Sequence, residues 1–308
     1  MLISFYGAIV QGLLMALMAL GVYITFRILD FPDLTVDGSY ATGGAIAAVM
    51  ITQGYNPLLA TLVAGVGGLI AGACTGLLHT KGKVNGLLAG ILMMIALYSI
   101  NIRIMGRPNT SVLGLDTLLS SIAKPWGLYI LVVGIAVLLI KLLLDAFLHT
   151  DLGLALRATG DNGRMIRSFG ANTDRMTILG VSLSNGLVAV SGALMAQYGG
   201  YADVTMGVGM IVIGLASVII GEAIFGTRTV VIATLAVVLG SIIYRIVIAL
   251  ALRVELFDAS DLKLITAVIV IIALIVPYLQ RSAKQKRVAR LRTTELMESI
   301  SLDNGGVK

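Results

Sequence analysis

The sequence predicts an all-α protein, a polytopic bundle of about nine (8–10) membrane-spanning helices. Of its 308 residues, 58% are hydrophobic and only 12% are charged, which is far from the composition of a soluble domain. Nearly the whole chain up to Leu279 divides into apolar stretches close to the roughly 20 residues that one crossing needs. The strands of a membrane barrel would instead show short segments of alternating polarity.

The predicted apolar segments follow one another with mostly short connections. They cover residues 4–28, 41–54, 57–78, 86–102, 125–147, 177–197, 208–221, 229–252 and 263–279. Several are shorter than a full crossing, and 36 glycines are spread along the chain, which favours close helix packing and broken helices. No basic residue precedes the first segment, so we expect it to stay as a helix and not to be a cleaved signal peptide.

Basic residues indicate the orientation. In a nine-segment arrangement, the turn 79–85, the loop 148–176 and the tail 281–308 all fall on the cytoplasmic side, as the positive-inside rule requires. The loop 103–124 also carries basic residues and falls outside, against this rule. We therefore expect a transmembrane domain at 1–280, an external N-terminus and a basic cytoplasmic tail. The chain has a net charge of +6, and six of its Lys/Arg residues follow the last apolar segment closely, at Arg281, Lys284, Lys286, Arg287, Arg290 and Arg292. This position favours lipid headgroups over nucleic acid as a partner.

Short matches between two parts of the chain suggest an inverted internal repeat. Asp33-Leu34-Thr35-Val36 is similar to Asp203-Val204-Thr205-Met206, and Gly44 falls at the same offset as Gly214. The halves would be about 4–102 and 177–279, linked by the helix 125–147 and the loop 148–176. Because the second half starts after an odd number of crossings, it would be upside down, as in many transporters. Accidental matching between glycine- and alanine-rich helices is the alternative.

The longest polar interruption, residues 150–175, has the pattern of an ordered element. Asp161 or Asn162 can cap a short helix, and Gly170 can supply the left-handed residue that ends it. Met165, Ile166 and Phe169 are spaced for one face of that helix. A short helix held beside the membrane is something a partner protein can push against. A merely solvated connector is the alternative.

A second interruption, the sequence FPDLTVDGS at 31–39, is acidic and too short for a soluble element. Broken backbone at membrane depth is tolerated only where it is buried in protein or lines a cavity, and ionisable residues there indicate function. The candidates for a pathway or its gate are Asp33, Thr35, Asp37 and Ser39, with Asp203 and Thr205 as their repeat counterparts. The alternative is that Asp33 and Asp37 only cap the start of a helix.

Small residues recur at Gly68, Gly72 and Gly76, a pattern that lets two helices approach closely. The stripe serves either packing within the chain or a dimer interface. The single cysteine, Cys74, is interpreted as a packing residue. Lys141, Glu222 and Arg245 lie within or at the ends of apolar segments, where snorkelling or an ion pair explains them as well as a transport role does.

Missing motifs exclude several classes of enzyme. The sequence has no G-x-x-x-x-G-K-[ST] phosphate loop, so we expect that the chain does not hydrolyse ATP. His79 and His149 are far apart without a metal-ligand companion, and no nucleophile elbow or paired-carboxylate pattern is present. We therefore expect no catalytic residue, no metal and no cofactor bound by this chain.

The run RATGDNGRMIRSFGANTDRMTILGVSLSNGLVAVSGALMAQYGG at 157–200 resembles the cytoplasmic loop and following helix of the branched-chain amino acid and ribose permease superfamily of ABC importers. The first segments and the run MGVGMIVIGLASVIIGEAIFG extend the resemblance over most of the chain. The phrases FPDLTVDGS and ATGDN are most similar to permeases paired with tryptophan- and tyrosine-type lipoprotein receptors. Because FPDLTVDGS differs from the branched-chain permeases, their substrate is not transferred.

The resemblance implies a multi-pass permease of the bacterial cytoplasmic (inner) membrane. A separate ABC ATPase would bind ATP and Mg, an external lipoprotein would deliver a small, amino acid-like solute, and two copies, or this chain and a related permease, would form a dimer. The coupling helix that contacts the ATPase would include Gly160, Asp161, Asn162, Arg164, Met165 and Gly170. An ion-coupled secondary transporter is the alternative. It would need ionisable groups near the midplane, whereas charges here cluster at segment ends.

Overall fold

The computed structural model describes residues 2–118, 120 and 126–251, together with the single residues 264, 267, 268, 271 and 275. The predicted segment 263–279 lies outside the described residues except at those single positions, and the tail 281–308 lies entirely outside them.

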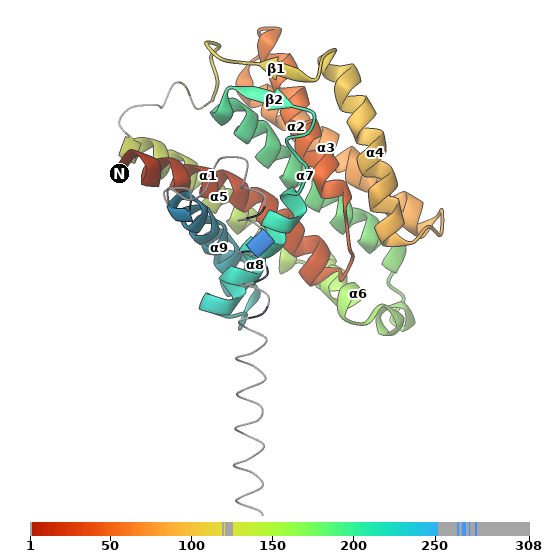
Figure 1. The fold of residues 1–308 in the computed structure, drawn as a ribbon. Coiled ribbons are helices and arrows are strands. Elements are labelled where there is room, and N and C mark those ends of the chain that lie inside the picture. Colours follow the sequence, from red (N-terminus) through yellow and green to blue (C-terminus); the bar gives the residue numbers. More distant parts are fainter. Residues whose placement is uncertain are drawn as a thin grey trace, which may run out of the picture.

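Helices make up most of the described chain (Figure 1). They are α1 (Leu2–Val22), its π-helical continuation η1 (Tyr23–Ile28), α2 (Thr35–Thr52), α3 (Pro57–Thr80), α4 (Gly86–Met105), α5 (Trp126–Leu148), α6 (Asp151–Ser168), α7 (Thr173–Gly199), α8 (Met210–Phe225) and α9 (Val230–Ala251). Two short strands, β1 (Asn109–Ser111) and β2 (Tyr201–Asp203), pair antiparallel. The predicted helical membrane class is confirmed.

Local sequence sets the ends of several helices. The side chain of Asn56 accepts a hydrogen bond from the Leu58 N–H, and Pro57 occupies the first helical position of α3. Asn85 caps α4 in the same way through the Leu87 N–H. α4 ends at Gly106, whose φ of 66° suits glycine.

The prediction of nine crossings is not supported. Among the described residues, six helical stretches are long and apolar enough to span a membrane: Phe5–Ile28, Pro57–Thr80, Gly86–Met105, Gly127–Leu148, Thr173–Gly199 and Val230–Ala251. α2 is not among them, because the polar residues in its first half lower its mean hydropathy. α8 has only 16 residues, about 24 Å at 1.5 Å per residue, which is shorter than the bilayer core.

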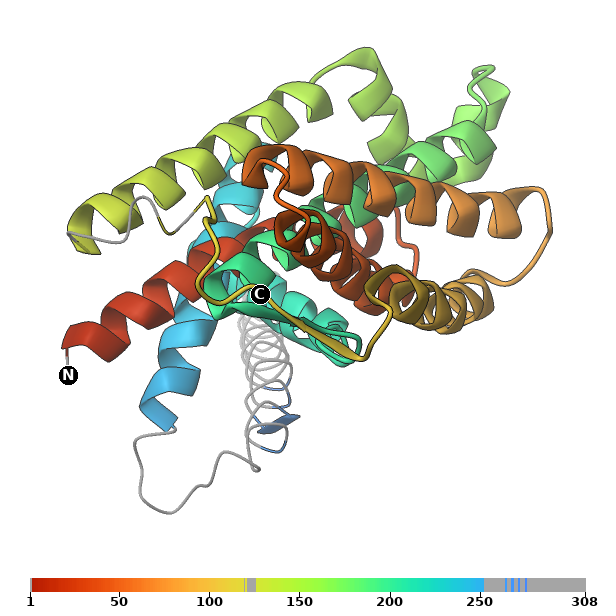
Figure 2. The ribbon, with the colours of Figure 1, turned by 90° about the horizontal axis from the view of Figure 1, so that it is seen from above.

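The bundle is organised around α7. Figures 1 and 2 show α2, α3 and α4 on one side of this helix and α1, α5 and α9 on the other. α7 packs against α1, α2 and α3. Helix contacts in the first part of the chain have counterparts in the second part. The contact of α2 with α3 corresponds to that of α8 with α9, and the contact of α3 with α7 corresponds to that of α9 with α1.

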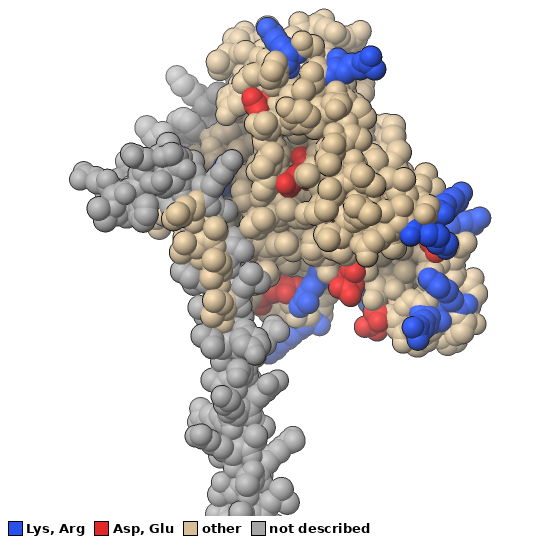
Figure 3. All heavy atoms as spheres, turned by 45° about the vertical axis from the view of Figure 1, so that its right-hand side comes forward, with Lys and Arg blue, Asp and Glu red and all other residues tan. Residues whose placement is uncertain are grey.

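The exterior suits a bilayer. Large apolar side chains are exposed along the outer faces of α3, α4 and α5, among them Leu62, Ile70, Ile95, Leu131 and Leu143. On the face drawn in Figure 3, charged side chains gather toward the upper and lower parts, with a belt of few charges between them. The fold therefore presents an apolar surface at the height of a membrane core.

The glycine stripe of α3 lies against α7 within the same chain. A Cβ on Gly72 would lie 2.8 Å from the Ser182 Cα, and a Cβ on Gly76 would lie 2.8 Å from the Ile178 Cα. A Cβ on Gly68 would lie 2.5 Å from the Ala189 Cβ. The backbones of α3 and α7 are therefore too close for a larger residue at these positions.

Gly68→Ala should lower the free energy of unfolding by about 1–3 kcal/mol, because the added methyl group forces two packed backbones apart. Thermal unfolding in detergent measures the effect. Gly127→Ala is the matched control, since no atom lies within 4 Å of a Cβ at this position of α5. Equal melting temperatures for the two variants would contradict the packing described here.

Candidate functional site

The connection between η1 and α2 turns back into the bundle. Asp30 takes up a left-handed conformation with φ of 51°. The Oδ1 of Asp33 then accepts a hydrogen bond from the Thr35 N–H at 2.9 Å, which starts α2. A Cβ on Gly90 would lie 2.7 Å from the Leu34 nitrogen, so α2 begins beside α4, one turn after α4 itself begins. Most of the stretch 31–39 thus lies inside the protein, with Pro32 exposed and Asp37 half-buried.

A buried polar network holds the start of α2. The Nδ2 of Asn185 on α7 donates to the Oδ2 of Asp33 at 2.6 Å, and the Oγ of Ser39 donates to the Oδ1 of Asn185 at 2.7 Å. The hydroxyls of Thr35 and Thr75 lie 2.8 Å apart, which links α2 to α3. All five side chains are fully buried. Three of the predicted candidates, Asp33, Thr35 and Ser39, are thus joined here, away from any open surface.

Asp37 makes a different contact. Its Oδ2 accepts from the Gly209 N–H and its Oδ1 accepts from the Ile211 N–H, both at 2.8 Å. These N–H groups belong to the start of α8, where the helix dipole favours a negative charge. The alternative that Asp33 and Asp37 cap helices describes this geometry well, with one addition: Asp37 caps a helix far away in the sequence.

Asp203 and Thr205 repeat the turn of Asp33 and Thr35. The Oδ1 of Asp203 accepts from the Thr205 N–H at 2.7 Å and from the Thr205 hydroxyl at 2.5 Å. Asp203 pairs with Asn109, which follows the end of α4, whereas Asp33 lies near its beginning. The two turns therefore lie toward opposite ends of α4 and do not form one site.

The loop 150–175 is ordered, as predicted, but its helix is longer than expected. α6 begins at Asp151 and is kinked at Asn162, whose φ of −153° and ψ of 83° are not helical. The Oδ1 of Asn162 accepts from the Met165 N–H at 3.1 Å, so Asn162 caps the second part of the helix. Gly170 follows with a φ of 85°. Asp161 lies beside the cap without forming it.

The second part of α6 exposes apolar side chains. Met165 is 51% exposed and Phe169 is 76% exposed, and Asp161 and Arg164 beside them are exposed as well. Large apolar groups grouped on an exposed helix indicate a surface that a partner covers. Gly160, at the other side of the kink, packs against the backbone of Ile28 and Leu29 at the end of η1.

Ion pairs account for most of the charges found in apolar segments. The Nε of Arg27 donates to the Oε1 of Glu222 at 2.8 Å, which joins the end of η1 to the end of α8. The Nζ of Lys141 lies 2.5 Å from the Oδ2 of Asp145, and the hydroxyl of Thr234 donates to Asp145. Within the described residues, no cluster of three or more His, Cys, Asp or Glu could hold a metal ion.

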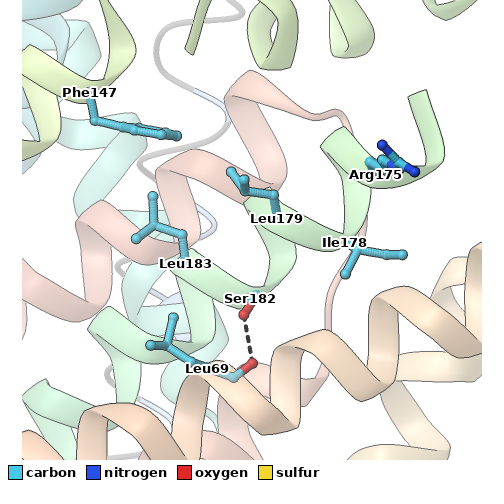
Figure 4. Close-up of a pocket in the computed structure, with 7 residues that line it drawn as sticks. All are labelled: Leu69, Phe147, Arg175, Ile178, Leu179, Ser182 and Leu183. Carbon is cyan, nitrogen blue, oxygen red and sulfur yellow. Dashed lines mark hydrogen bonds between the residues drawn. The ribbon is translucent and has the colours of Figure 1, made fainter. Parts of the chain in front are cut away.

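A peripheral groove of about 470 Å³ lies between α3, α5 and α7 (Figure 4). Its wall is formed by Leu69, Phe147, Arg175, Ile178, Leu179, Ser182 and Leu183. The hydroxyl of Ser182 donates to the Leu69 carbonyl at 2.6 Å, as Figure 4 shows. The groove thus offers a solute few free polar groups, and its large volume does not make it a transport site.

Two residues of the polar network, Asn185 and Thr75, were not predicted from the sequence. Each is a single polar residue within an apolar segment, and this isolation is the one feature of the sequence that could have indicated a role for it. Their partners Asp33 and Thr35 lie 152 and 40 residues away in the sequence.

Asn185→Leu should lower the free energy of unfolding by about 3 kcal/mol, because it leaves the buried Asp33 carboxylate without its side-chain donor. Thermal unfolding of the purified chain measures this loss. Thr205→Val is the control: it removes a comparable contact from the exposed Asp203 turn and should change stability by about 0.5 kcal/mol or less. A stable Asn185→Leu protein would show that the network does not hold α2.

Comparisons with known proteins agree with this architecture. A family model described as "Branched-chain amino acid transport system / permease component" matches residues 4–276. The chain is 46% identical over 276 residues to the tyrosine transport system permease protein of Clostridioides difficile (strain R20291), covering 89% of this chain and 92% of that protein. It is 37% identical over 273 residues to the uncharacterized protein RP368 of Rickettsia prowazekii (strain Madrid E), covering 87% and 95%.

A more distant relative is the ribose import permease protein RbsC of Escherichia coli (strain K12), 28% identical over 212 residues, which cover 67% of this chain and 65% of that protein. No solved structure matches. The family resemblance inferred from the sequence is confirmed. The chain belongs to the branched-chain amino acid transport system permease family, and it is a multi-pass membrane permease of an ABC-type transport system.

Proposed function

We propose that this chain is the permease subunit of an ATP-driven importer in the bacterial cytoplasmic (inner) membrane, carrying an amino acid or a similar small solute. An external lipoprotein delivers the solute, and a separate ABC ATPase binds ATP and Mg. The observation that carries the proposal is the second part of α6, which is capped by Asn162 and exposes Met165 and Phe169. The relative named as a tyrosine transport permease supports an amino acid as the solute.

The contacts of α6 suggest how the ATPase acts on the permease. Met165 and Phe169 dock on the ATPase, with Asp161 and Arg164 as polar contacts beside them. A movement of α6 reaches Ile28 and Leu29 directly, because Gly160 packs against their backbone. From there it passes to the stretch 29–37, which ends in the polar network and in the cap of α8.

The pairing of the helices supports the inverted repeat, with halves at about 4–102 and 177–279. The pair α2 and α3 corresponds to α8 and α9, and the contact of α3 with α7 corresponds to that of α9 with α1. The equivalent turns at Asp33 and Asp203 support the same relation. In this arrangement the N-terminus is external and α6 and the tail 281–308 are cytoplasmic. Two such domains, identical or related, enclose the pathway.

The alternative from the sequence, an ion-coupled secondary transporter, disagrees with membership of an ABC-type permease family, although one observation favours ion coupling. Asp37 lies beside the middle of α4, since a Cβ on the adjacent Gly38 would lie 3.2 Å from the Met94 Cα. An acidic residue at this depth is what ion coupling needs. Uptake that follows a proton or sodium gradient without ATP would favour this candidate.

Met165→Ala/Phe169→Ala should weaken binding of the ATPase about tenfold, because each substitution removes an apolar anchor from the contact. Asp161→Ala/Arg164→Ala should leave the complex assembled but uncouple ATP hydrolysis from uptake. The measurements are co-purification with the partner ABC ATPase, solute uptake into proteoliposomes and receptor-stimulated ATP hydrolysis.

The control is Arg107→Ala/Asp116→Ala, which changes exposed charges in the connection between α4 and α5. This variant should bind the ATPase and import solute like the unsubstituted protein. Coupled uptake retained in both α6 double variants would rule out α6 as the contact with the ATPase.

A further inference from the structure

A cavity of about 260 Å³ lies between α2, α4 and the segment that leads into α8. Three parts of the chain line the cavity. α4 contributes Met94, Ile95, Tyr98 and Asn101, α2 contributes Asp37, and the segment after β2 contributes Val204 and Val208. The contributing residues of α4 lie in the middle and C-terminal part of the span Gly86–Met105. The cavity is separate from the peripheral groove, and it opens to the outside of the chain beside the exposed side chains of Ile95, Tyr98 and Val208.

Asn101 is the unusual member of this lining. Its side chain is 0% exposed, and neither its Nδ2 nor its Oδ1 has a hydrogen-bond partner within the described residues. Buried carboxamides are nearly always bonded, since an unpaired donor or acceptor is unfavourable in apolar surroundings. An asparagine that borders a cavity with both atoms free is suited to a ligand that supplies an acceptor and a donor.

Asp37 provides the complementary charge. Each of its oxygens accepts one N–H from the start of α8 and keeps further acceptor capacity, and its side chain is only half-buried. The carboxylate is therefore held in place at the edge of the cavity, of whose lining Asp37 is a part. Around these two polar groups the walls are apolar or aromatic: Met94, Ile95, Tyr98, Val204 and Val208.

We propose that this cavity binds the transported solute as an amino acid zwitterion with an apolar or aromatic side chain. Its ammonium group contacts Asp37, its carboxylate accepts from the Asn101 carboxamide, and its side chain packs against Met94, Ile95 and Tyr98. The inference rests on the proposed function. It adds the residues that contact the solute, and it connects solute binding to α8, because the same carboxylate caps that helix.

Asn101→Leu is the most informative variant. Since Asn101 bonds to no described residue, the substitution should keep or raise the melting temperature. Uptake of a radiolabelled amino acid mixture by the complete complex in proteoliposomes should nevertheless fall about tenfold, the change expected for losing one hydrogen bond to a charged group. Asp37→Asn, which keeps an acceptor for α8 but removes the charge, should reduce uptake similarly. Full uptake by both variants would overturn the inference.

Thiol labelling tests occupancy directly. In a Cys74→Ser background, N-ethylmaleimide should react with a Val208→Cys variant, and an excess of the imported amino acid should slow the reaction during turnover. The same compound without its ammonium group should not. Val212→Cys, two residues into α8 and outside the cavity lining, is the matched control and should not be protected.

The two proposals fail in different ways. A Val208→Cys variant that does not react, or reacts equally with and without amino acid, contradicts the binding site while leaving ATP-driven import intact. An unsubstituted complex that imports no amino acid with ATP and receptor present overturns the proposed function itself.

Discussion

The arrangement of this permease depends on one hydrogen-bonded contact, the carboxylate of Asp37 at the N-terminus of α8. A helix that begins inside a membrane protein exposes N–H groups that neither lipid nor the helix can satisfy, at several kcal/mol for each unpaired group. Asp37 accepts two of these N–H groups, from Gly209 and Ile211. This contact allows α8 to be a short helix that starts beside the middle of the bundle.

The position of Asp37 is in turn set by the buried network at the start of α2. Asp33, Ser39 and Asn185 join α2 to α7, and the Thr35 and Thr75 hydroxyls join it to α3. Arg27, at the other end of the same connection, pairs with Glu222 near the end of α8. One stretch, residues 27–37, therefore holds α8 at both of its ends. Because α6 packs on this stretch at Ile28, the exposed part of α6 and the cavity beside Asp37 share a structural connection.

Apolar composition predicted the helical membrane class and placed several helices closely: the segments 57–78, 86–102 and 125–147 correspond to α3, α4 and α5. It failed for the number of crossings. Composition does not distinguish a helix facing lipid from one like α2, which is surrounded by protein and can carry Asp37, Ser39 and Thr42. Glycine spacing likewise predicted that α3 packs closely, but not that its neighbour is α7.

The candidate site was predictable only in part. The acidic stretch 31–39 and the cap near Asn162 have local signatures, since turns and caps depend on residues a few positions apart. Asn185 and Asn101 have no such signature. Each is a single polar residue in an apolar run, and its role depends on elements distant in the sequence: Asp33 for Asn185, and the cavity formed with α2 for Asn101.

Amide hydrogen exchange of the permease in lipid nanodiscs tests the cap of α8 most directly. The amides of Gly209 and Ile211 should exchange slowly in the unsubstituted protein and much faster in an Asp37→Ala variant, while the amide of Thr35, bonded to Asp33, should keep its protection. Unchanged exchange at Gly209 and Ile211 in the variant would contradict the account, because α8 would then be held without Asp37.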